Sequence, residues 1–290
     1  MVTIENQYFS IPQICMSGQC FRLDPVSGDT YELIASDRYL RIKVEEGAPS
    51  GAADGGEGRK GGAGRTVLYC SSEEYESFWK RYFDLDTSYE EYLAGIDPKD
   101  EYLRTAAWFG SGIRILRQDV WEMIITFILS QQNNIPRIKG LIQAVSGKYG
   151  QKMETADGKL YDAFPTPEQL ADASEEELRA LKLGYRSRYI SGTARMIADG
   201  EVKLDELKNM DYPEARAELM KFPGIGGKVA DCICLFALHQ MDAFPVDTHI
   251  QKVLDTRYGG KFPFEKYKGC AGVMQQYIFY YDLKGNIEKA

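Results

Sequence analysis

The 290-residue sequence lacks paired cysteines, a long hydrophobic run and an excess of basic residues. Its six cysteines are scattered without CxxC spacing, so neither a zinc site nor an iron–sulfur cluster is indicated, and we expect free thiols in a reducing cytoplasm. No stretch approaches the roughly eighteen apolar residues of a membrane helix, and the amino terminus has no basic segment followed by an apolar one. We therefore expect neither a secretion signal nor a membrane span.

The net charge of −8 argues against a uniformly basic DNA-binding protein, because contacts to phosphate need lysine and arginine. One segment differs from this average. The stretch from Leu178 to Ala198 has no acidic residue and five basic ones, namely Arg179, Lys182, Arg186, Arg188 and Arg195. A solvated helix face would explain this segment if it stood alone, and a local basic surface is the alternative.

The periodicity of the apolar residues divides the chain into two parts. Alternation over residues 30–46 predicts a pair of antiparallel strands, and residues 66–70 predict another strand. Between them, residues 47–65 carry eight glycines, which predicts a flexible loop. After about residue 97 the period becomes helical. We therefore predict an α+β protein with an antiparallel-sheet domain over residues 1–96 and a helical domain over residues 97–290.

Helix start signals occur along the second part. Asp119 is placed to cap a long apolar helix through Leu129. Thr166 and Ser174 are each followed three residues later by glutamine or glutamate, which is the pattern of a capping box.

A helix-hairpin-helix is predicted at about residues 212–238. Gly224 and Gly226 permit a tight turn between two helices. Such a turn points backbone amides at the start of the second helix toward an anion, so a DNA phosphate could bind there without any side-chain charge. A hairpin that needs glycine only for close packing is the alternative.

Two residues near this hairpin have side chains suited to catalysis. Lys228 lies in the first turn of the second helix, where the positive end of the helix dipole disfavours an ammonium group. An unprotonated amine there could attack an electrophilic sugar carbon. Asp247 follows an extended segment and is placed to cap the next helix; beyond capping, its carboxylate could stabilise positive charge on a sugar. A solvated lysine and a capping aspartate are the simpler interpretations of each residue alone.

Several motifs together resemble the helix-hairpin-helix (HhH-GPD) glycosylase superfamily, and closely its 8-oxoguanine DNA glycosylase branch. FPGIGGKVADCICLFAL followed by PVDTHI is similar to the catalytic segment of that branch. Further similar segments follow in the same order: SGQCFR (17–22), GIRILRQD (112–119), SQQNNIPRI (130–138), LGYRSRY (183–189) and the carboxy-terminal helix over 272–283.

The resemblance implies a fold and an activity. The fold is a TBP-like antiparallel-sheet domain followed by an all-helical HhH-GPD domain. The activity is base excision repair of double-stranded DNA by a bifunctional glycosylase and lyase that flips 8-oxoguanine out of the duplex and removes it, preferably opposite cytosine. Lys228 would attack C1′ and form an imine that supports β-elimination, and Asp247 would stabilise the sugar. The resemblance further implies a bacterial-type monomer acting on the nucleoid without a required cofactor.

Six residues would bind the damaged nucleotide if the resemblance extends to the site. The Gly18 carbonyl would read N7 of the oxidised base, which donates a hydrogen bond where guanine accepts one. Gln275 would read the Watson–Crick edge, although a solvent-facing helix residue is the alternative. Cys232 and Phe279 would sandwich the base. His249 and Asp282 would form a pair on the phosphate side.

The resemblance also assigns a set of residues to the undamaged strand and to an ion. Gln132, Arg137 and Arg186 would read the cytosine opposite the lesion, with Tyr185 as a wedge. Gln132 stands where the eukaryotic pattern has asparagine, which leaves the strictness of the cytosine preference open. An optional monovalent cation or calcium ion would bind the hairpin carbonyls of Met220, Phe222 and Ile225.

Two other functions are compatible with a helix-hairpin-helix. Superfamily members acting on oxidised pyrimidines usually carry four clustered carboxy-terminal cysteines, whereas this chain has only Cys270 there, and alkylpurine enzymes usually lack the lysine. A non-catalytic DNA-binding protein would need neither Lys228 nor Asp247. Both comparisons favour the 8-oxoguanine assignment.

Overall fold

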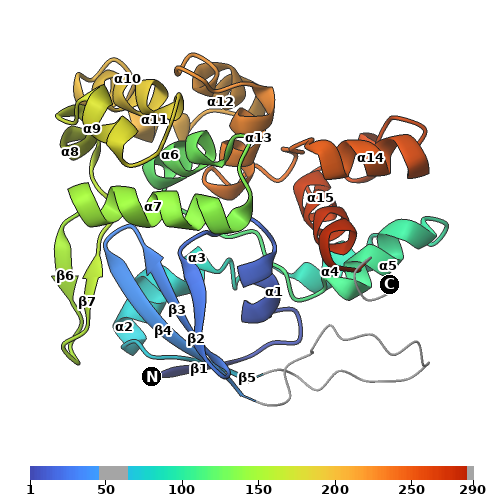
Figure 1. Cartoon of the computed structure of the whole chain (residues 1–290). Helices are drawn as coiled ribbons and strands as arrows, with labels where there is room; N and C mark the ends of the chain where they lie inside the picture. The colour runs from blue at the N-terminus through green and yellow to red at the C-terminus, as the bar shows by residue number, and fades with distance from the viewer. Residues whose placement is uncertain (46–64, 286–290) are drawn as a thin grey trace.

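An antiparallel sheet at the amino-terminal end and a larger assembly of helices make up the computed structural model, which describes residues 1–45 and 65–285 (Figure 1). The α+β prediction is therefore confirmed. The predicted flexible loop at residues 47–65 lies outside the described residues except for Arg65, which begins a strand. In the described ranges, no helix combines the length and apolar character needed to cross a membrane. All six cysteines are free, as expected.

The sheet contains five antiparallel strands in the order β1-β5-β4-β3-β2. Leu40, Ile42 and Val44 are buried and alternate with more exposed residues, as a strand with one face on a core requires. The strands are β1 (Val2–Glu5), β2 (Leu23–Ser27), β3 (Thr30–Ala35), β4 (Arg38–Glu45) and β5 (Arg65–Leu68). Both predicted strand regions are thus confirmed. The elements that pack on the sheet core are α1 (Ile11–Met16), the π-helix η1 (Tyr75–Trp79) and α3 (Lys80–Tyr82), and the short helix α2 (Ser72–Glu74) precedes η1.

The helical part is built around α6, in which every residue from Val120 to Leu129 is buried. Asp119 caps this helix as predicted, since its side chain accepts a hydrogen bond from the Glu122 amide at 2.8 Å. The two predicted capping boxes are also present. The elements are α4 (Tyr89–Ala94), α5 (Glu101–Phe109), α6 (Val120–Ser130), α7 (Ile135–Tyr149), α8 (Pro167–Ala171), α9 (Glu175–Ala180), α10 (Arg186–Ala198), α11 (Leu204–Leu207), α12 (Tyr212–Leu219), α13 (Gly227–Phe236), α14 (Thr248–Arg257), η2 (Phe264–Lys266), α15 (Ala271–Tyr280) and the π-helix η3 (Tyr281–Gly285).

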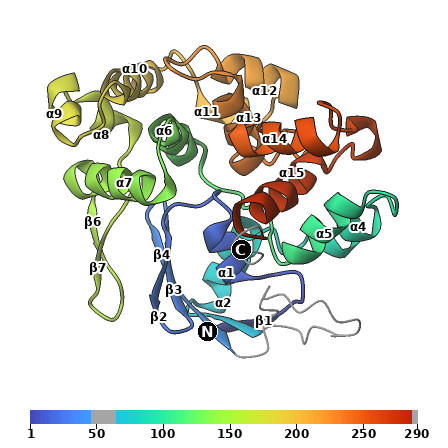
Figure 2. The same ribbon diagram turned by 45° about the vertical axis from the view of Figure 1, so that its right-hand side comes forward.

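One segment of the predicted helical domain is not helical. Strands β6 (Lys152–Glu154) and β7 (Leu160–Asp162) form an antiparallel hairpin that projects alongside the first sheet (Figures 1 and 2). Lys159 binds Glu32, and the Tyr161 hydroxyl donates to the Asp37 carbonyl at 2.8 Å. Strands this short show little periodicity, and contacts with residues more than a hundred positions away stabilise them.

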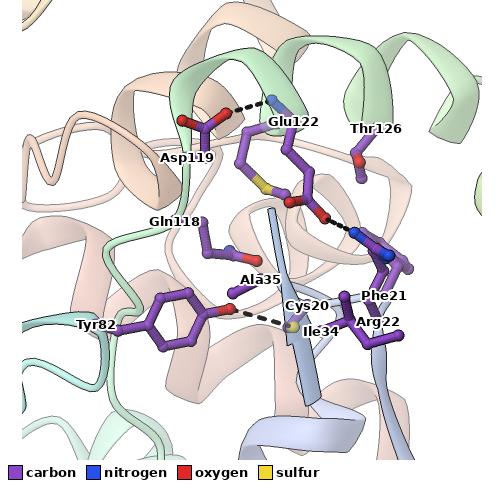
Figure 3. Close-up of a pocket in the computed structure, with 11 residues that line it drawn as sticks. Cys20, Phe21, Arg22, Ile34, Ala35, Tyr82, Gln118, Asp119, Glu122 and Thr126 are labelled. Atoms are coloured by element: carbon purple, nitrogen blue, oxygen red, sulfur yellow. Dashed lines mark hydrogen bonds and ion pairs between the residues drawn. The ribbon is translucent and has the colours of Figure 1, made fainter. Parts of the chain in front are cut away.

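A buried carboxylate connects the sheet to the central helix (Figure 3). Glu122 on α6 accepts a hydrogen bond from the Ser36 amide at 2.8 Å and lies 3.5 Å from the Arg22 guanidinium. Burial raises the pKa of Glu122, and the charge of Arg22 opposes that rise. The sheet core includes Leu116, and the helical core includes Phe21. Each core thus includes a residue from the other side of residue 96. The domain boundary proposed there stays a prediction.

The two glycines of the helix-hairpin-helix turn have different surroundings. Gly224 has a φ of +77°, and a Cβ added to it would lie 2.3 Å from Cδ2 of Tyr189. Gly226 has a φ of −96°, and an added Cβ would meet no atom within 4 Å. The turn therefore needs glycine at Gly224 both for its backbone conformation and for close packing, whereas Gly226 borders open space.

Glu122→Gln should change how stability depends on pH. Because the pKa of Glu122 is raised on folding, the unfolded chain loses this proton at a lower pH than the folded protein. As pH rises from the ordinary value of 4.5 toward the raised pKa, the free energy of unfolding of the wild type therefore falls through this group. The variant should gain stability relative to the wild type over that interval, as urea unfolding between about pH 4 and pH 8 would measure. A pH-independent difference would contradict this.

Gly224→Ala should lower the free energy of unfolding by about 1–3 kcal/mol, because a Cβ is strained at positive φ and collides with Tyr189. Gly226→Ala is the matched control in the same turn, and it should leave stability within about 0.5 kcal/mol of the wild type. Chemical denaturation of the three proteins tests this. Equal losses in the two variants would show that the turn's glycines are not distinguished by packing.

Candidate active site

The first turn of α13 places Lys228 at the surface. Gly226 is the residue that caps this helix, and glycine offers no side-chain acceptor to the first amides. Other helices of the chain, such as α6, have a side chain in that place. Because the first amides of a helix carry partial positive charge, the uncapped start of α13 is suited to binding an anion.

Lys228, Cys232 and Asp247 lie together. Burial raises the pKa of the Cys232 thiol to about 11, the charge of Lys228 opposes this rise, and the charges of Asp231 and Asp247 add to it. Cys232 therefore stays a neutral thiol at physiological pH. A neutral thiol is a poor nucleophile, so the structure does not favour Cys232 in that role, and Lys228 stays the predicted nucleophile.

A carboxylate near Lys228 is held by other partners. Asp231, three residues further along α13, accepts hydrogen bonds from Arg216 Nε at 2.6 Å and from the Tyr212 hydroxyl at 2.9 Å. Both partners belong to α12, so these contacts also fix the two helices of the hairpin together. In the part of the chain that the structure describes, Lys228 forms no ion pair with a carboxylate.

Asp247 caps α14 as predicted. Its Oδ1 accepts a hydrogen bond from the Ile250 amide at 2.9 Å, and its backbone is extended, as a capping position requires. The residue is half-buried. A carboxylate has acceptor sites on both oxygens, so the capping bond leaves Oδ2 able to interact with positive charge.

Helix α15 contributes an amide to the same region. Gln275 is only 3% exposed, so its interpretation as a solvent-facing residue is wrong. Its Nε2 donates to the Pro245 carbonyl at 3.0 Å, and its Oε1 accepts from Gln276 at 3.1 Å. The first of these bonds joins α15 to the extended segment that leads to Asp247.

Phe279 connects two other candidates. A Cβ added at Gly18 would lie 3.0 Å from Cε1 of Phe279, and Gly18 has a φ of +75°. The His249 ring is 5.8 Å from the Phe279 ring, nearly perpendicular to it. His249 Nδ1 lies 2.7 Å from Asp282 Oδ2, so the predicted histidine–carboxylate contact is present. The sandwich implied for Phe279 and Cys232 stays a prediction.

The residues assigned to the opposite base lie at the starts of α7 and α10 and in the segments that precede these helices. Arg137 donates from Nε to the Asn133 side chain at 3.0 Å and from Nη2 to the Lys182 carbonyl at 3.2 Å. Tyr185 is 43% exposed, as a wedge would need to be. Gln132 is exposed in a left-handed backbone conformation with a φ of +52°.

Arg186 differs from this group because it is buried. Its Nε donates to the Gln131 carbonyl at 3.1 Å, and its Nη2 also binds that carbonyl. Its Cζ lies 4.5 Å from the centre of the Tyr185 ring. Direct access to an opposite base therefore requires Arg186 to use the guanidinium hydrogens that these contacts leave free.

The contacts of the hairpin carbonyls support a cation site only in part. The Phe222 carbonyl accepts a hydrogen bond from the Ile225 amide at 3.2 Å, which leaves one lone pair for a cation. Met220 ends α12 in a helical conformation. Within the described ranges, no group of three or more His, Cys, Asp and Glu side chains could hold a metal. An ion bound by Met220, Phe222 and Ile225 stays a prediction.

Two residues that the sequence analysis did not select hold the site together. Arg216 binds Asp231, and Gln131 binds Arg186 through its carbonyl. Gln131 also donates from Nε2 to the Gly224 carbonyl at 3.1 Å. No spacing rule identifies such partners, because each contact depends on the folded arrangement of separate elements.

Both parts of the chain match protein families. Residues 1–124 match the 8-oxoguanine DNA glycosylase, N-terminal domain, and residues 125–262 match the HhH-GPD superfamily base excision DNA repair protein. The chain is 37% identical over 190 residues to the N-glycosylase/DNA lyase of Saccharomyces cerevisiae and 37% identical over 196 residues to N-glycosylase/DNA lyase OGG1 of Arabidopsis thaliana. These matches cover 61% and 64% of the chain. The chain spans about half the length of these curated relatives, 50% and 53%.

Solved structures are similar over almost the whole chain. MBOgg1 in complex with a low-affinity DNA ligand has a TM-score of 0.87 at 32% identity, covering 98% of this chain and 96% of its own. The Clostridium acetobutylicum 8-oxoguanine glycosylase/lyase, in complex with double-stranded DNA containing cytosine opposite to 8-oxoG, has a TM-score of 0.84 at 34% identity, covering 98% and 94%. With both family models matching in the same order, the chain belongs to the 8-oxoguanine DNA glycosylase family.

Proposed function

We propose that the chain is a bifunctional DNA glycosylase and lyase that removes 8-oxoguanine from double-stranded DNA in base excision repair. The observation that carries this proposal is that Lys228, at the uncapped start of α13, and Asp247, at the start of α14, both lie near Cys232. A phosphate-binding hairpin alone would need the amides only. A lysine that forms no ion pair with a carboxylate of the described residues, together with a half-buried aspartate, would supply the nucleophile and the charge that base removal requires.

The base would be recognised after it is flipped out of the duplex. The Gly18 carbonyl would accept a hydrogen bond from N7, which carries hydrogen only in the oxidised base. Gln275 keeps one amide hydrogen and one lone pair beyond its bonds to Pro245 and Gln276. It could therefore both donate to and accept from the Watson–Crick edge, with Cys232 and Phe279 on the two faces of the base.

The reaction would proceed through a covalent imine. Nζ of Lys228 attacks C1′ as the bond from C1′ to the base breaks, and the departing base takes the bonding electrons and a proton. Asp247 stabilises the positive charge that develops on the sugar. Opening of the sugar ring gives the imine. Loss of a proton from C2′ then expels the 3′ phosphate by β-elimination, and hydrolysis releases Lys228.

The remaining residues would hold the DNA. The amides at Gly226 and Gly227 would bind phosphate, aided by a cation at the carbonyls of Met220, Phe222 and Ile225 if one is present. His249, paired with Asp282, would face a second phosphate. Gln132, Arg137, Tyr185 and Arg186 would occupy the gap and read cytosine. We propose that the enzyme acts as a monomer in the cytoplasm, on the bacterial-type nucleoid, and that the chemistry needs no cofactor.

Lys228→Gln should abolish borohydride trapping on a duplex containing 8-oxoguanine, because the imine cannot form without the amine. The wild type should give a covalent protein–DNA adduct. Binding of the same duplex should stay within about threefold of the wild type, since the hairpin amides and arginines are unchanged. Gel analysis of borohydride-treated mixtures and a binding titration measure the two quantities. An adduct formed by the variant would refute Lys228 as the nucleophile.

Asp247→Asn should slow base release about 100-fold or more, by removing a charge aimed at the reacting sugar. Asparagine is also a good helix cap, so the free energy of unfolding should change by less than about 1 kcal/mol. Single-turnover excision and urea unfolding separate the two roles. A variant that loses stability but keeps its rate per folded molecule would show that Asp247 is only a cap.

A further inference from the structure

We propose that Gln131 is a positioning residue that connects recognition of the opposite base to the hairpin that presents Lys228. This inference rests on the proposed function. Its consequence is that cytosine opposite the lesion increases the rate of base excision itself, in addition to increasing the affinity for DNA.

Gln131 uses its backbone and its side chain for different partners. It is the residue that ends α6, with an extended ψ of 126°, and it is half-buried. Its carbonyl accepts from Nε of Arg186 at 3.1 Å and from Nη2 of the same residue. Its Nε2 donates to the carbonyl of Gly224 at 3.1 Å. One residue therefore joins Arg186 to the turn that precedes Lys228.

A second set of contacts joins the same two regions. Gly224 packs directly on Tyr189, and the Tyr189 ring lies 5.8 Å from that of Tyr185, nearly perpendicular to it. Tyr185 in turn contacts the Arg186 guanidinium. Gln131, Gly224, Tyr189, Tyr185 and Arg186 thus form a closed circuit of contacts. A displacement of Arg186 would therefore affect Gly224 both through Gln131 and through the two tyrosines.

The neighbouring amide serves a different purpose. Asn133 donates to the Leu129 carbonyl at 2.8 Å and accepts from Arg137 at 3.0 Å, so both of its contacts stay within residues 129–137. Gln132 between them is exposed. Residues 131 and 133 thus each hold one of the two candidate reading arginines, and the hairpin bond belongs to the Gln131 side chain.

These contacts couple the position of Arg186 to that of the hairpin turn at Gly224. When cytosine engages Arg186, its guanidinium becomes fixed between the base and the Gln131 carbonyl, and the Gln131 side chain fixes Gly224. Adenine opposite the lesion would leave Arg186 without that partner. Two sites that restrain the same element are coupled, and each makes the other's ordering easier.

Gln131→Met tests the coupling, because methionine matches glutamine in size but donates no hydrogen bond. Gln131→Glu is a second variant of the same shape without the donor. Gln143→Met is the matched control, since Gln143 is an exposed residue on α7 outside the circuit. The measurements are single-turnover excision of 8-oxoguanine opposite cytosine and opposite adenine, and binding of duplexes with a tetrahydrofuran abasic analogue opposite each base.

We expect both Gln131 variants to lose about three- to tenfold of the rate opposite cytosine while the rate opposite adenine stays unchanged, as loss of one hydrogen bond would give. The cytosine-to-adenine ratio of binding affinities should stay within about twofold of the wild type, because both arginines remain. Gln143→Met should match the wild type in every measurement.

The inference is overturned if the rates opposite both bases fall equally, which would indicate a structural role only. It is also overturned if the wild type excises 8-oxoguanine equally fast opposite cytosine and adenine, or if the Gln131 variants keep the wild-type ratio of the two rates. A wild type that neither excises 8-oxoguanine nor forms a borohydride adduct would instead refute the proposed function. The two failures are therefore distinguishable.

Discussion

The start of α13 carries amide groups without a side-chain cap and a lysine in the same turn. Both features destabilise a helix, because unsatisfied amides favour an anion and the helix dipole disfavours an ammonium group there. Contacts elsewhere in the hairpin offset this cost. Arg216 and Tyr212 bind Asp231 from α12, and Gly224 packs on Tyr189 of α10. The hairpin thus keeps an uncapped helix start because the rest of it is firmly packed.

The structural role of Asp247 would also serve its proposed chemical role. The capping bond to Ile250 fixes its orientation, and a fixed carboxylate needs little reorganisation when positive charge develops nearby. The bond from Gln275 to Pro245 fixes the segment that leads to it. The proposed base-reading residue and the proposed catalytic carboxylate therefore share one support, and α13, α14 and α15 lie near one another (Figures 1 and 2).

Local signals in the sequence were sufficient where the structure depends on neighbours in the chain. The cap at Asp119, the position of Lys228 in the first turn of α13 and the cap at Asp247 all follow from spacing over a few residues. The β6–β7 hairpin and the Gln131 bond could not be predicted in this way. Gln131 meets Gly224 across 93 positions, and side-chain periodicity carries no information about such a partner. Likewise, the burial of Gln275 depends on how α15 packs against the Pro245 segment.

The net charge of −8 is compatible with DNA binding because the proposed contacts are local and largely uncharged. Backbone amides at the start of α13 donate to phosphate without adding formal charge. Arg179 of the basic segment is tied to Glu175, and Arg186 is buried against Gln131. That segment is therefore neither a uniform basic surface nor a simple solvated face. Its arginines divide between structure and solvent, and Lys182 and Arg188 remain exposed beside Tyr185. Affinity for DNA then depends on where the charges lie, because screening limits the influence of distant carboxylates to about 8–10 Å at physiological salt.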